Sequence, residues 1–174
     1  MSEAEQVELA RQGDMQAWEA LVNAHQQAVF RLAYLIIGDP DEAEDITQEA
    51  FVRAYFSLAR FDTQRSLRPW LVTIAVNLAR NQQRSLSRYW AAIQRWANHQ
   101  PHLGIQPDST GDHLGSQELW AAVRQLGPDD QKVIYLRFFL EMSEAETAQS
   151  LGLPVGTVKS RQHRALARLR KQME

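Results

Sequence analysis

The sequence predicts an all-α protein made of two small helical domains joined by a flexible linker. Apolar residues recur at helical spacing through most of the chain, and no segment shows the strict alternation typical of a strand. Residues 98–116 contain Pro or Gly at five positions and few large apolar side chains, which is typical of a linker. We therefore expect an N-terminal domain at 1–97, a linker at 98–116 and a C-terminal domain at 117–174.

The N-terminal domain is expected to contain a series of helices separated by short breaks. Gly38 and Pro40 interrupt the pattern, and the acids from Asp41 to Asp45 suit the first turn of the helix that follows. Pro69 suits the first turn of another helix, after the polar loop "RFDTQRSLRP". The predicted helices span 17–37, 41–58, 69–84 and 88–96.

The C-terminal domain contains the pattern of a helix-turn-helix. Ser143 and Glu146 have the spacing of a capping box, Gly152 suits a left-handed helix end, and Pro154 starts the next helix. Two helices across such a short turn form the motif, whose second helix enters the major groove of DNA. The predicted helices span 117–126, 130–140, 144–151 and 155–172.

Charge alternates along the chain although the total is only −2. Residues 1–60 carry eleven acids and four bases (−7), 61–95 one acid and six bases (+5), 96–154 eight acids and three bases (−5), and 155–174 one acid and six bases (+5). Two separate basic blocks indicate two contacts with a polyanion, although solvated helix faces would also explain either block. The chain lacks cysteine, an apolar run long enough to cross a membrane, and a signal peptide, so a reducing interior is expected.

The last helix contains the cations expected of a recognition helix. Its early residues are expected to meet base edges or phosphates, and Arg164 and Arg168 to reach the DNA backbone. A basic amphipathic helix that packs on an acidic partner or a membrane surface is the alternative. The expected DNA-contacting residues are Thr157, Lys159, Ser160, Arg161, Arg164 and Arg168.

The other basic block, "RSLRPWLVTIAVNLARNQQR", suits an unpaired strand better than duplex DNA. Aromatic side chains offer stacking surfaces for bases, and arginines follow the backbone. Phe61 and Trp70 flank the basic loop, although Trp70 is better explained as part of the core. Asn77, Arg80, Asn81 and Arg84 recur at helical spacing.

Three motifs in this order resemble the extracytoplasmic-function (ECF) sigma factors of bacterial RNA polymerase. "GDPDEAEDITQEAFVRAY" resembles the core-binding segment of sigma region 2, and "FDTQRSLRPWLVTIAVNLARN" resembles its melting and −10 recognition segment. "LGPDDQKVIYLRFFLEMSEAETAQSLGLPVGTVKSRQHRAL" resembles the −35-binding region 4. The resemblance implies a cytoplasmic factor that directs promoter-specific initiation by core polymerase, bound to promoter DNA and regulated by an anti-sigma factor.

The resemblance also implies roles for particular residues. Asp45, Gln48 and Glu49 match positions that bind the clamp of the large catalytic subunit, and Phe61 and Asn77 match positions that hold a flipped base. The −35 recognition helix of the family is matched by Thr157, Lys159, Ser160, Arg161 and Arg164. The full expected −10 set is Phe61, Arg65, Arg68, Asn77, Arg80, Asn81 and Arg84.

The sequence departs from the family pattern in two places. The loop after Phe61 lacks an early glycine and reads Asp62-Thr63-Gln64. "RYWAAIQRW" adds Tyr89, Trp90 and Trp96, which would provide either extra packing or a docking face for an inhibitor.

Two other classes of protein are weighed against a sigma factor. A plain regulator would bind duplex DNA without polymerase, which leaves the acidic helix around Asp45 unexplained. An enzyme is not expected, because the five histidines do not cluster at metal-ligand spacing and no phosphate-binding loop of the GxxxxGK type is present. We expect no metal and no cofactor.

Overall fold

The computed structural model describes residues 1–97 and 117–173, and every regular element in these ranges is helical. The predicted linker at 98–116 lies outside the described residues. The N-terminal domain comprises α1 (Glu3–Arg11), α2 (Met15–Ile37), α3 (Pro40–Ser57), a 3₁₀ turn (Leu58–Arg60) and α4 (Leu67–Ala97). The C-terminal domain comprises α5 (Gln117–Arg124), α6 (Pro128–Ile134), a π-helical turn (Tyr135–Phe139), α7 (Glu144–Leu151) and α8 (Val155–Met173). The all-α prediction is confirmed.

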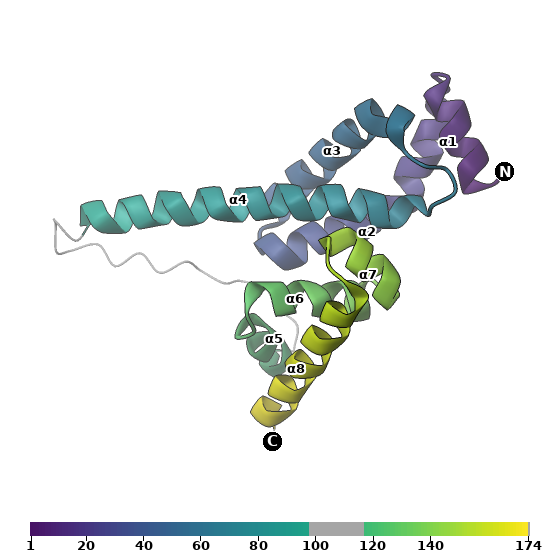
Figure 1. Cartoon of the computed structure of the whole chain (residues 1–174). Helices are drawn as coiled ribbons and strands as arrows, with labels where there is room; N and C mark the ends of the chain where they lie inside the picture. Colours follow the sequence, from purple (N-terminus) through teal and green to yellow (C-terminus); the bar gives the residue numbers. More distant parts are fainter. Residues whose placement is uncertain (98–116, 174) are drawn as a thin grey trace.

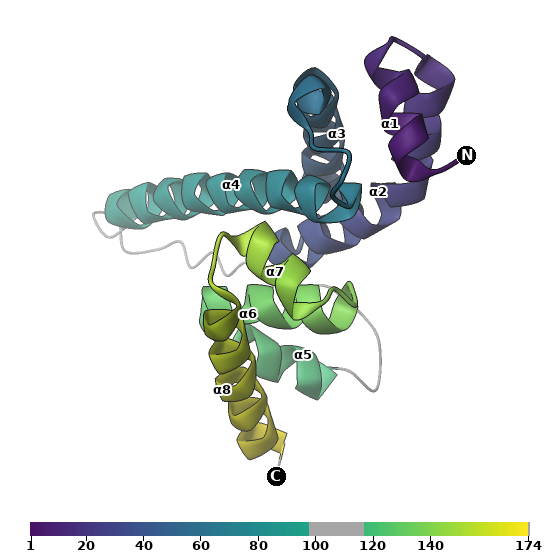
Figure 2. The same cartoon turned by 45° about the vertical axis from the view of Figure 1, so that its right-hand side comes forward.

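The first domain packs α1 to α4 around a common apolar core, and the second lies beneath it (Figures 1 and 2). Large side chains from α2 and α4, such as Leu21, Leu32 and Leu71, are almost fully buried. Leu136 and Met142 are equally buried in the second domain. Apolar residues therefore recur at helical spacing because each helix buries one face.

The predicted breaks and caps form at the expected residues. Gly38 ends α2 with φ of 83°, and Asp39 caps α3 by accepting from the Glu42 N–H at 3.0 Å. Ser143 and Glu146 form the capping box of α7, and Gly152 ends that helix with φ of 64°. A left-handed φ of this kind is easy for glycine, which has no Cβ.

The predicted helices differ from the observed ones in three places. α4 is one uninterrupted helix of 31 residues, where two shorter helices were expected. α4 starts at Leu67, so Pro69 lies in its first turn. Backbone N–H groups in the first turn have no acceptor within the helix, so the N–H that proline lacks costs no helical hydrogen bond. No Gly or Pro follows Arg84 within α4 to end the helix. The helix expected at 130–140 starts earlier, at Pro128, and passes into a π-helical turn at Tyr135.

The third difference is α1, which the sequence prediction omitted. Ser2 and Glu5 form a complete capping box at its start, and Val7 and Ala10 are buried. The S-x-x-E pattern of residues 2–5 was the signal that could have found it. Arg11 and Glu3 of this helix hold the loop before α4, because the Arg11 Nε donates to the Leu58 carbonyl at 3.0 Å and Leu67 N–H donates to Glu3 at 3.0 Å.

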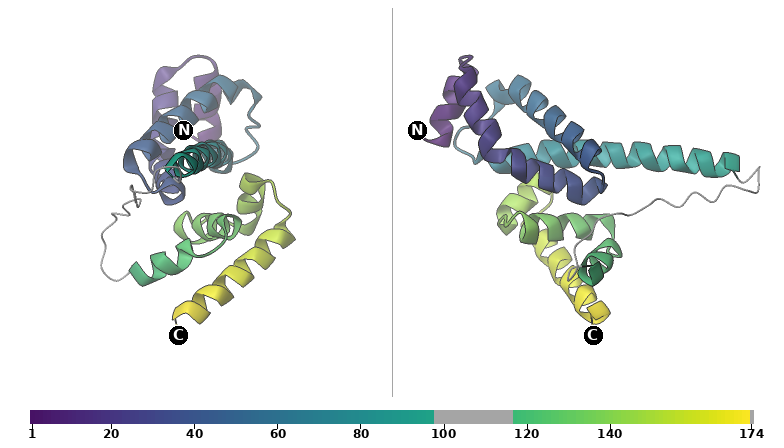
Figure 3. Two further views of the ribbon diagram at one scale, coloured as in Figure 1. Left: turned by 90° about the vertical axis from the view of Figure 1, so that its left-hand side faces the viewer. Right: turned by 180° about the vertical axis from the view of Figure 1, so that it is seen from behind.

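The two domains pack against each other through α7 and the N-terminal half of α4 (Figures 1 and 2). The buried Ser150 hydroxyl donates to the Pro69 carbonyl at 3.0 Å, and the Arg68 Nη2 donates to the Leu140 carbonyl at 2.6 Å. We call this the closed arrangement. The C-terminal part of α4 extends past the rest of the N-terminal domain (Figure 3).

Candidate polymerase and nucleic-acid interfaces

One face of α3 carries the three residues predicted to bind polymerase. Asp45, Gln48 and Glu49 are all exposed, and their spacing places them on the same side of the helix. Val52 and Phe56 continue this face toward the C-terminus of α3, with 49% and 82% of their surfaces exposed. Exposed large apolar residues beside acids are typical of a protein-binding surface. The sequence prediction missed these two, although their i+4 and i+7 spacing from Gln48 and Glu49 was visible.

Four of the predicted −10 residues form a stripe on α4. Asn77, Asn81 and Arg84 are exposed, Arg80 is half-buried, and the i, i+3, i+4, i+7 spacing places them on one face. Arg88 continues the stripe and is also exposed. This stripe offers guanidinium and amide groups along one line, which suits a nucleic-acid backbone and base edges.

The loop before α4 has a different character from the stripe. Phe61 is only 7% exposed, and its ring lies 4.9 Å from that of Trp70. Arg65 is exposed and its Nε lies 3.4 Å from the Asp62 carboxylate. Asp62 also accepts from the Gln64 N–H at 3.0 Å, so an Asx turn orders the loop where the family glycine is missing. The Phe61 ring therefore belongs to the apolar core.

Arg68 lies away from the α4 stripe, at the boundary between the domains. Its Nη2 donates to the Leu140 carbonyl, whereas its Nε is buried and has no hydrogen-bond partner among the described residues. In the closed arrangement α7 and the segment before it therefore cover this predicted −10 residue.

The recognition helix α8 presents most of its predicted DNA-contacting residues on one face. One arc of the helix, beside the buried stripe, contains Thr157, Ser160, Arg161, Arg164 and Arg168. Lys159 lies on the other side of that stripe. Val158, Ala165 and Leu169 are the buried residues that dock the helix.

Three of the α8 cations are paired with acids of the same domain. Lys159 lies 3.5 Å from Glu144, and Arg161 Nη1 lies 3.2 Å from Asp129. Arg168 Nη1 lies 3.6 Å from the second acid of α6, Asp130. Arg164 is exposed and makes no ion pair with any described residue. Among the predicted DNA-contacting cations of α8, it is therefore the one most available to a phosphate.

Comparison with known proteins finds two family models that match separate parts of the chain. Residues 21–89 match the family model "Sigma-70 region 2", and residues 116–169 match "Sigma-70, region 4". The chain is 33% identical over 179 aligned positions to the ECF RNA polymerase sigma factor SigW of Bacillus subtilis strain 168, covering 96% of this chain and 94% of that relative. This chain is an ECF sigma factor.

Solved structures show the same fold over nearly the whole sigma factor. CnrH in complex with the cytosolic domain of CnrY has a TM-score of 0.74 at 25% identity, covering 98% of this chain and 96% of that one. RpoE in complex with the anti-sigma factor NepR, from Bartonella quintana, has a TM-score of 0.66 at 25% identity, covering 89% and 95% of the two chains. The relatives are transcription initiation factors rather than enzymes.

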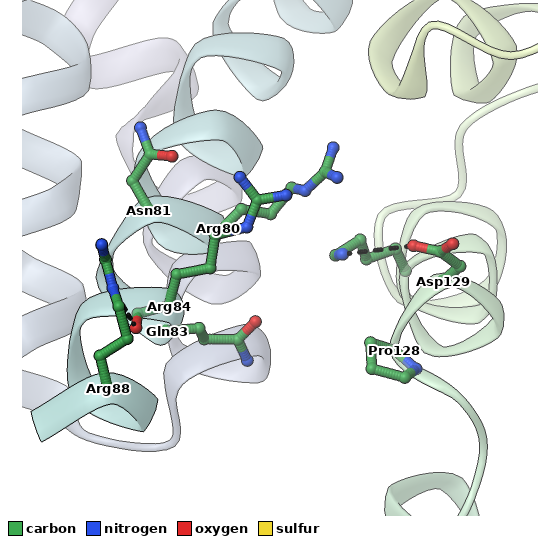
Figure 4. A pocket seen from close by; sticks show the side chains of 8 residues that line it. Arg80, Asn81, Gln83, Arg84, Arg88, Pro128 and Asp129 are labelled. Carbon is green, nitrogen blue, oxygen red and sulfur yellow. Dashed lines mark hydrogen bonds and ion pairs between the residues drawn. The ribbon is translucent and has the colours of Figure 1, made fainter. Parts of the chain in front are cut away.

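The sigma factor places a pocket of about 780 Å³ between its two regions, lined by α4 on one side and α6 on the other (Figure 4). Lys132 of α6 is only 7% exposed there. Burial lowers the pKa of its ammonium group, and the charge of Arg80 lowers it further, against the opposing effect of Asp129. The sequence prediction missed Lys132 because a single lysine within an amphipathic helix gives no such signal.

The described residues form neither a metal site nor a membrane-spanning helix. Within 1–97 and 117–173 there is no cluster of three or more His, Cys, Asp or Glu that could hold a metal ion. No helix in these ranges has the length and apolar character needed to cross a membrane. The side chains of Tyr89, Trp90 and Trp96 lie outside those that the structure describes.

Proposed function

We propose that this sigma factor binds core RNA polymerase through α3, opens the −10 element through α4 and its preceding loop, and holds the −35 duplex through α8. The observation that supports this proposal is that α3, α4 and α8 present three surfaces with different charge and apolar character. The α3 face is acidic and apolar, as expected for a protein partner, whereas α4 and α8 present cations.

On α3, the occupant is the clamp of the large catalytic subunit. Asp45, Gln48 and Glu49 supply polar contacts, and Val52 and Phe56 supply apolar area that is exposed in the free protein. The Glu49 carboxylate is already held by Arg53 at 2.6 Å, which fixes its direction. A surface of this kind gives affinity through Phe56 and orientation through the carboxylates.

On α4, the occupant is the melted strand of the −10 element. Asn77 and Asn81 can hydrogen-bond the edges of unpaired bases, and Arg80 and Arg84 can follow the phosphates. Arg65 and Arg68 extend the basic surface into the loop, and Phe61 with Trp70 forms the apolar floor against which a flipped base would rest. Capture of bases accounts for strand opening without a nucleotide-hydrolysing site.

Binding to both elements requires the closed arrangement to open. The −10 and −35 elements lie about 25 base pairs apart, which is about 85 Å of duplex at 3.4 Å per base pair. The C-terminal domain packs on the N-terminal half of α4 and contacts Arg68, so the closed form does not leave the whole proposed −10 surface free. The nineteen residues from 98 to 116 can span at most about 65 Å, which permits the separation when the domains' own dimensions are added.

An anti-sigma factor is the proposed regulatory partner, by analogy with the RpoE–NepR complex. It would act in the cytoplasm, where polymerase and promoter are found. The closed arrangement offers such a partner a form of the sigma factor in which part of the −10 surface is already covered.

Run-off transcription tests the whole proposal. The purified chain is mixed with bacterial core polymerase and a library of promoter-length duplexes, and the transcripts are sequenced. Starts downstream of a shared two-part motif would support the proposal. A chain that shifts duplex DNA but neither joins core polymerase nor redirects initiation would instead be a plain regulator.

A further inference from the structure

The pocket between α4 and α6 contains far more positive than negative charge. Arg80, Arg84 and Arg88 line it from α4, Lys132 lines it from α6, and Asp129 is the acid among the lining residues (Figure 4). We infer that this pocket is a binding site for a small polyphosphate anion, which bridges the two domains and holds the closed arrangement.

Lys132 shows that the pocket contains too little negative charge. Its side chain is 9% exposed, and a cation with so little exposed surface favours a close anionic partner. The nearest carboxylate oxygen, from Asp129, lies 3.6 Å away, which is too long for a strong hydrogen bond.

Asp129 cannot neutralise this group of cations alone. Its other oxygen lies 3.2 Å from Arg161 Nη1, so one carboxylate is shared between two cations while three arginines of α4 stand opposite. Arg80 is close enough to Lys132 to oppose its protonation. The closed arrangement therefore brings like charges together, and a bound anion would convert this repulsion into attraction.

The number and placement of the cations indicate the class of ligand. A single phosphate could meet one or two of them, whereas linked phosphates can reach the guanidinium groups of α4 and the ammonium of α6 together. A volume of about 780 Å³ accommodates such an anion with or without an attached nucleoside. A DNA duplex, whose major groove alone is about 12 Å wide, does not fit between the domains.

Anion binding at this site would interfere with promoter binding. This conclusion rests on the proposed function. Arg80 and Arg84 belong to the proposed −10 surface, so the anion and the melted strand compete for the same side chains. Because the anion also contacts α6, it opposes separation of the domains. The polyphosphate is thus an inhibitor of the free sigma factor.

Calorimetric titration of the full chain with inorganic tripolyphosphate, ATP and GTP tests the binding site. We expect saturable binding of one anion per chain, and Lys132→Gln should weaken it by about tenfold, the value of one charge-assisted hydrogen bond. The matched control is Lys171→Gln, which removes the same charge from the exposed end of α8 and should leave the affinity within about twofold. Equal binding of tripolyphosphate and both nucleotides identifies the phosphate chain as the ligand, whereas tighter ATP or GTP binding adds a nucleoside contact.

Two results would overturn the inference. The first is no saturable binding of any of the three anions. The second is equal weakening by Lys132→Gln and Lys171→Gln, because that would indicate diffuse attraction to a basic surface. Circular dichroism and thermal melting of Lys132→Gln show whether the variant is folded, and they keep a folding defect from being read as lost binding.

A distance measurement between the domains tests the bridging role separately. The chain has no cysteine, so Glu44→Cys in α3 and Gln172→Cys in α8 can be labelled with a donor and an acceptor. Tripolyphosphate should narrow the distance distribution in the labelled chain, and Lys132→Gln should raise the anion concentration needed for this effect by about tenfold. Run-off transcription by the same chain reports the proposed function independently, so loss of anion binding with normal transcription refutes only this inference.

Discussion

Truncation of Phe56 offers the sharpest test of the polymerase-binding surface. The ring is 82% exposed in the free chain, so Phe56→Ala removes little packing and should change the free energy of unfolding by no more than about 0.5 kcal/mol. An aromatic side chain buries about 150–250 Å² in an interface, which at about 25 cal/mol per Å² gives an upper limit of about 4–6 kcal/mol. Incomplete burial and the ordering of the ring reduce this figure, and we expect a loss of about 2 kcal/mol, or roughly thirtyfold in Kd for core polymerase.

The assay is a fluorescence-anisotropy titration of labelled sigma factor with core polymerase, accompanied by thermal melting of each variant. Phe51→Ala is the control from the same helix, because this ring is 7% exposed and packs near Trp18. It should lose about 3–5 kcal/mol of stability, while the molecules that remain folded keep their affinity for polymerase. If Phe56→Ala binds polymerase as tightly as the original chain, the assignment of the α3 face is refuted.

Three other changes probe the DNA-binding surfaces and the closed arrangement. Asn77→Ala should slow strand opening by about tenfold, the value of one hydrogen bond to a captured base, as measured by permanganate reactivity at the −10 element. Arg164→Gln should weaken −35 duplex binding and lower the slope of log K against log salt by about one, because one phosphate contact is lost. Ser150→Ala should destabilise the closed arrangement by about 0.5–1.5 kcal/mol, because one hydrogen bond between the domains is lost while the Pro69 carbonyl keeps the Thr73 hydroxyl as a donor, and the distance distribution between labelled domains should broaden.

Each of these expectations has a contradicting outcome. Normal opening by Asn77→Ala would remove that side chain from the −10 pocket. An unchanged salt slope for Arg164→Gln, with normal folding, would mean that Arg164 does not face the backbone. An unchanged distance distribution for Ser150→Ala would show that the hydrogen bond to Pro69 contributes nothing to the contact between domains.

Local signals in the sequence predicted most of the fold. Ser143, Glu146 and Gly152 specify the start and end of α7 through backbone hydrogen bonds and a left-handed φ, which depend on neighbours in the chain. The start of α4 was placed two residues too late, because Pro69 marks a first turn equally well for a helix that begins at Leu67. Burial of Leu67 and its hydrogen bond to Glu3 fix the start of this helix, and that contact joins residues 64 positions apart.

For the site residues too, features of a single helix could be predicted from the sequence, whereas contacts between distant segments could not. Helical spacing was enough to align Asn77, Arg80 and Arg84 on one face of α4, because that alignment is a property of a single helix. Arg68 is half-buried and contacts the Leu140 carbonyl of the other domain, and no pattern within its own segment predicts this. Phe61 has the chemical type expected of a base-binding pocket, but the motif does not predict that its ring packs against Trp70.

Because α4 is one uninterrupted helix, a small rotation near its start displaces its far end by a larger distance. The helix rises about 1.5 Å per residue, so the nineteen steps from Pro69, where α7 makes contact, to Arg88 cover about 28 Å. A rotation of about 10° about that contact would leave Pro69 almost in place and move Arg88 by about 5 Å relative to the C-terminal domain. Small rearrangements at Ser150 are therefore amplified toward the far end of the helix, and a spectroscopic probe near Arg88 would detect opening that a probe beside the contact would miss.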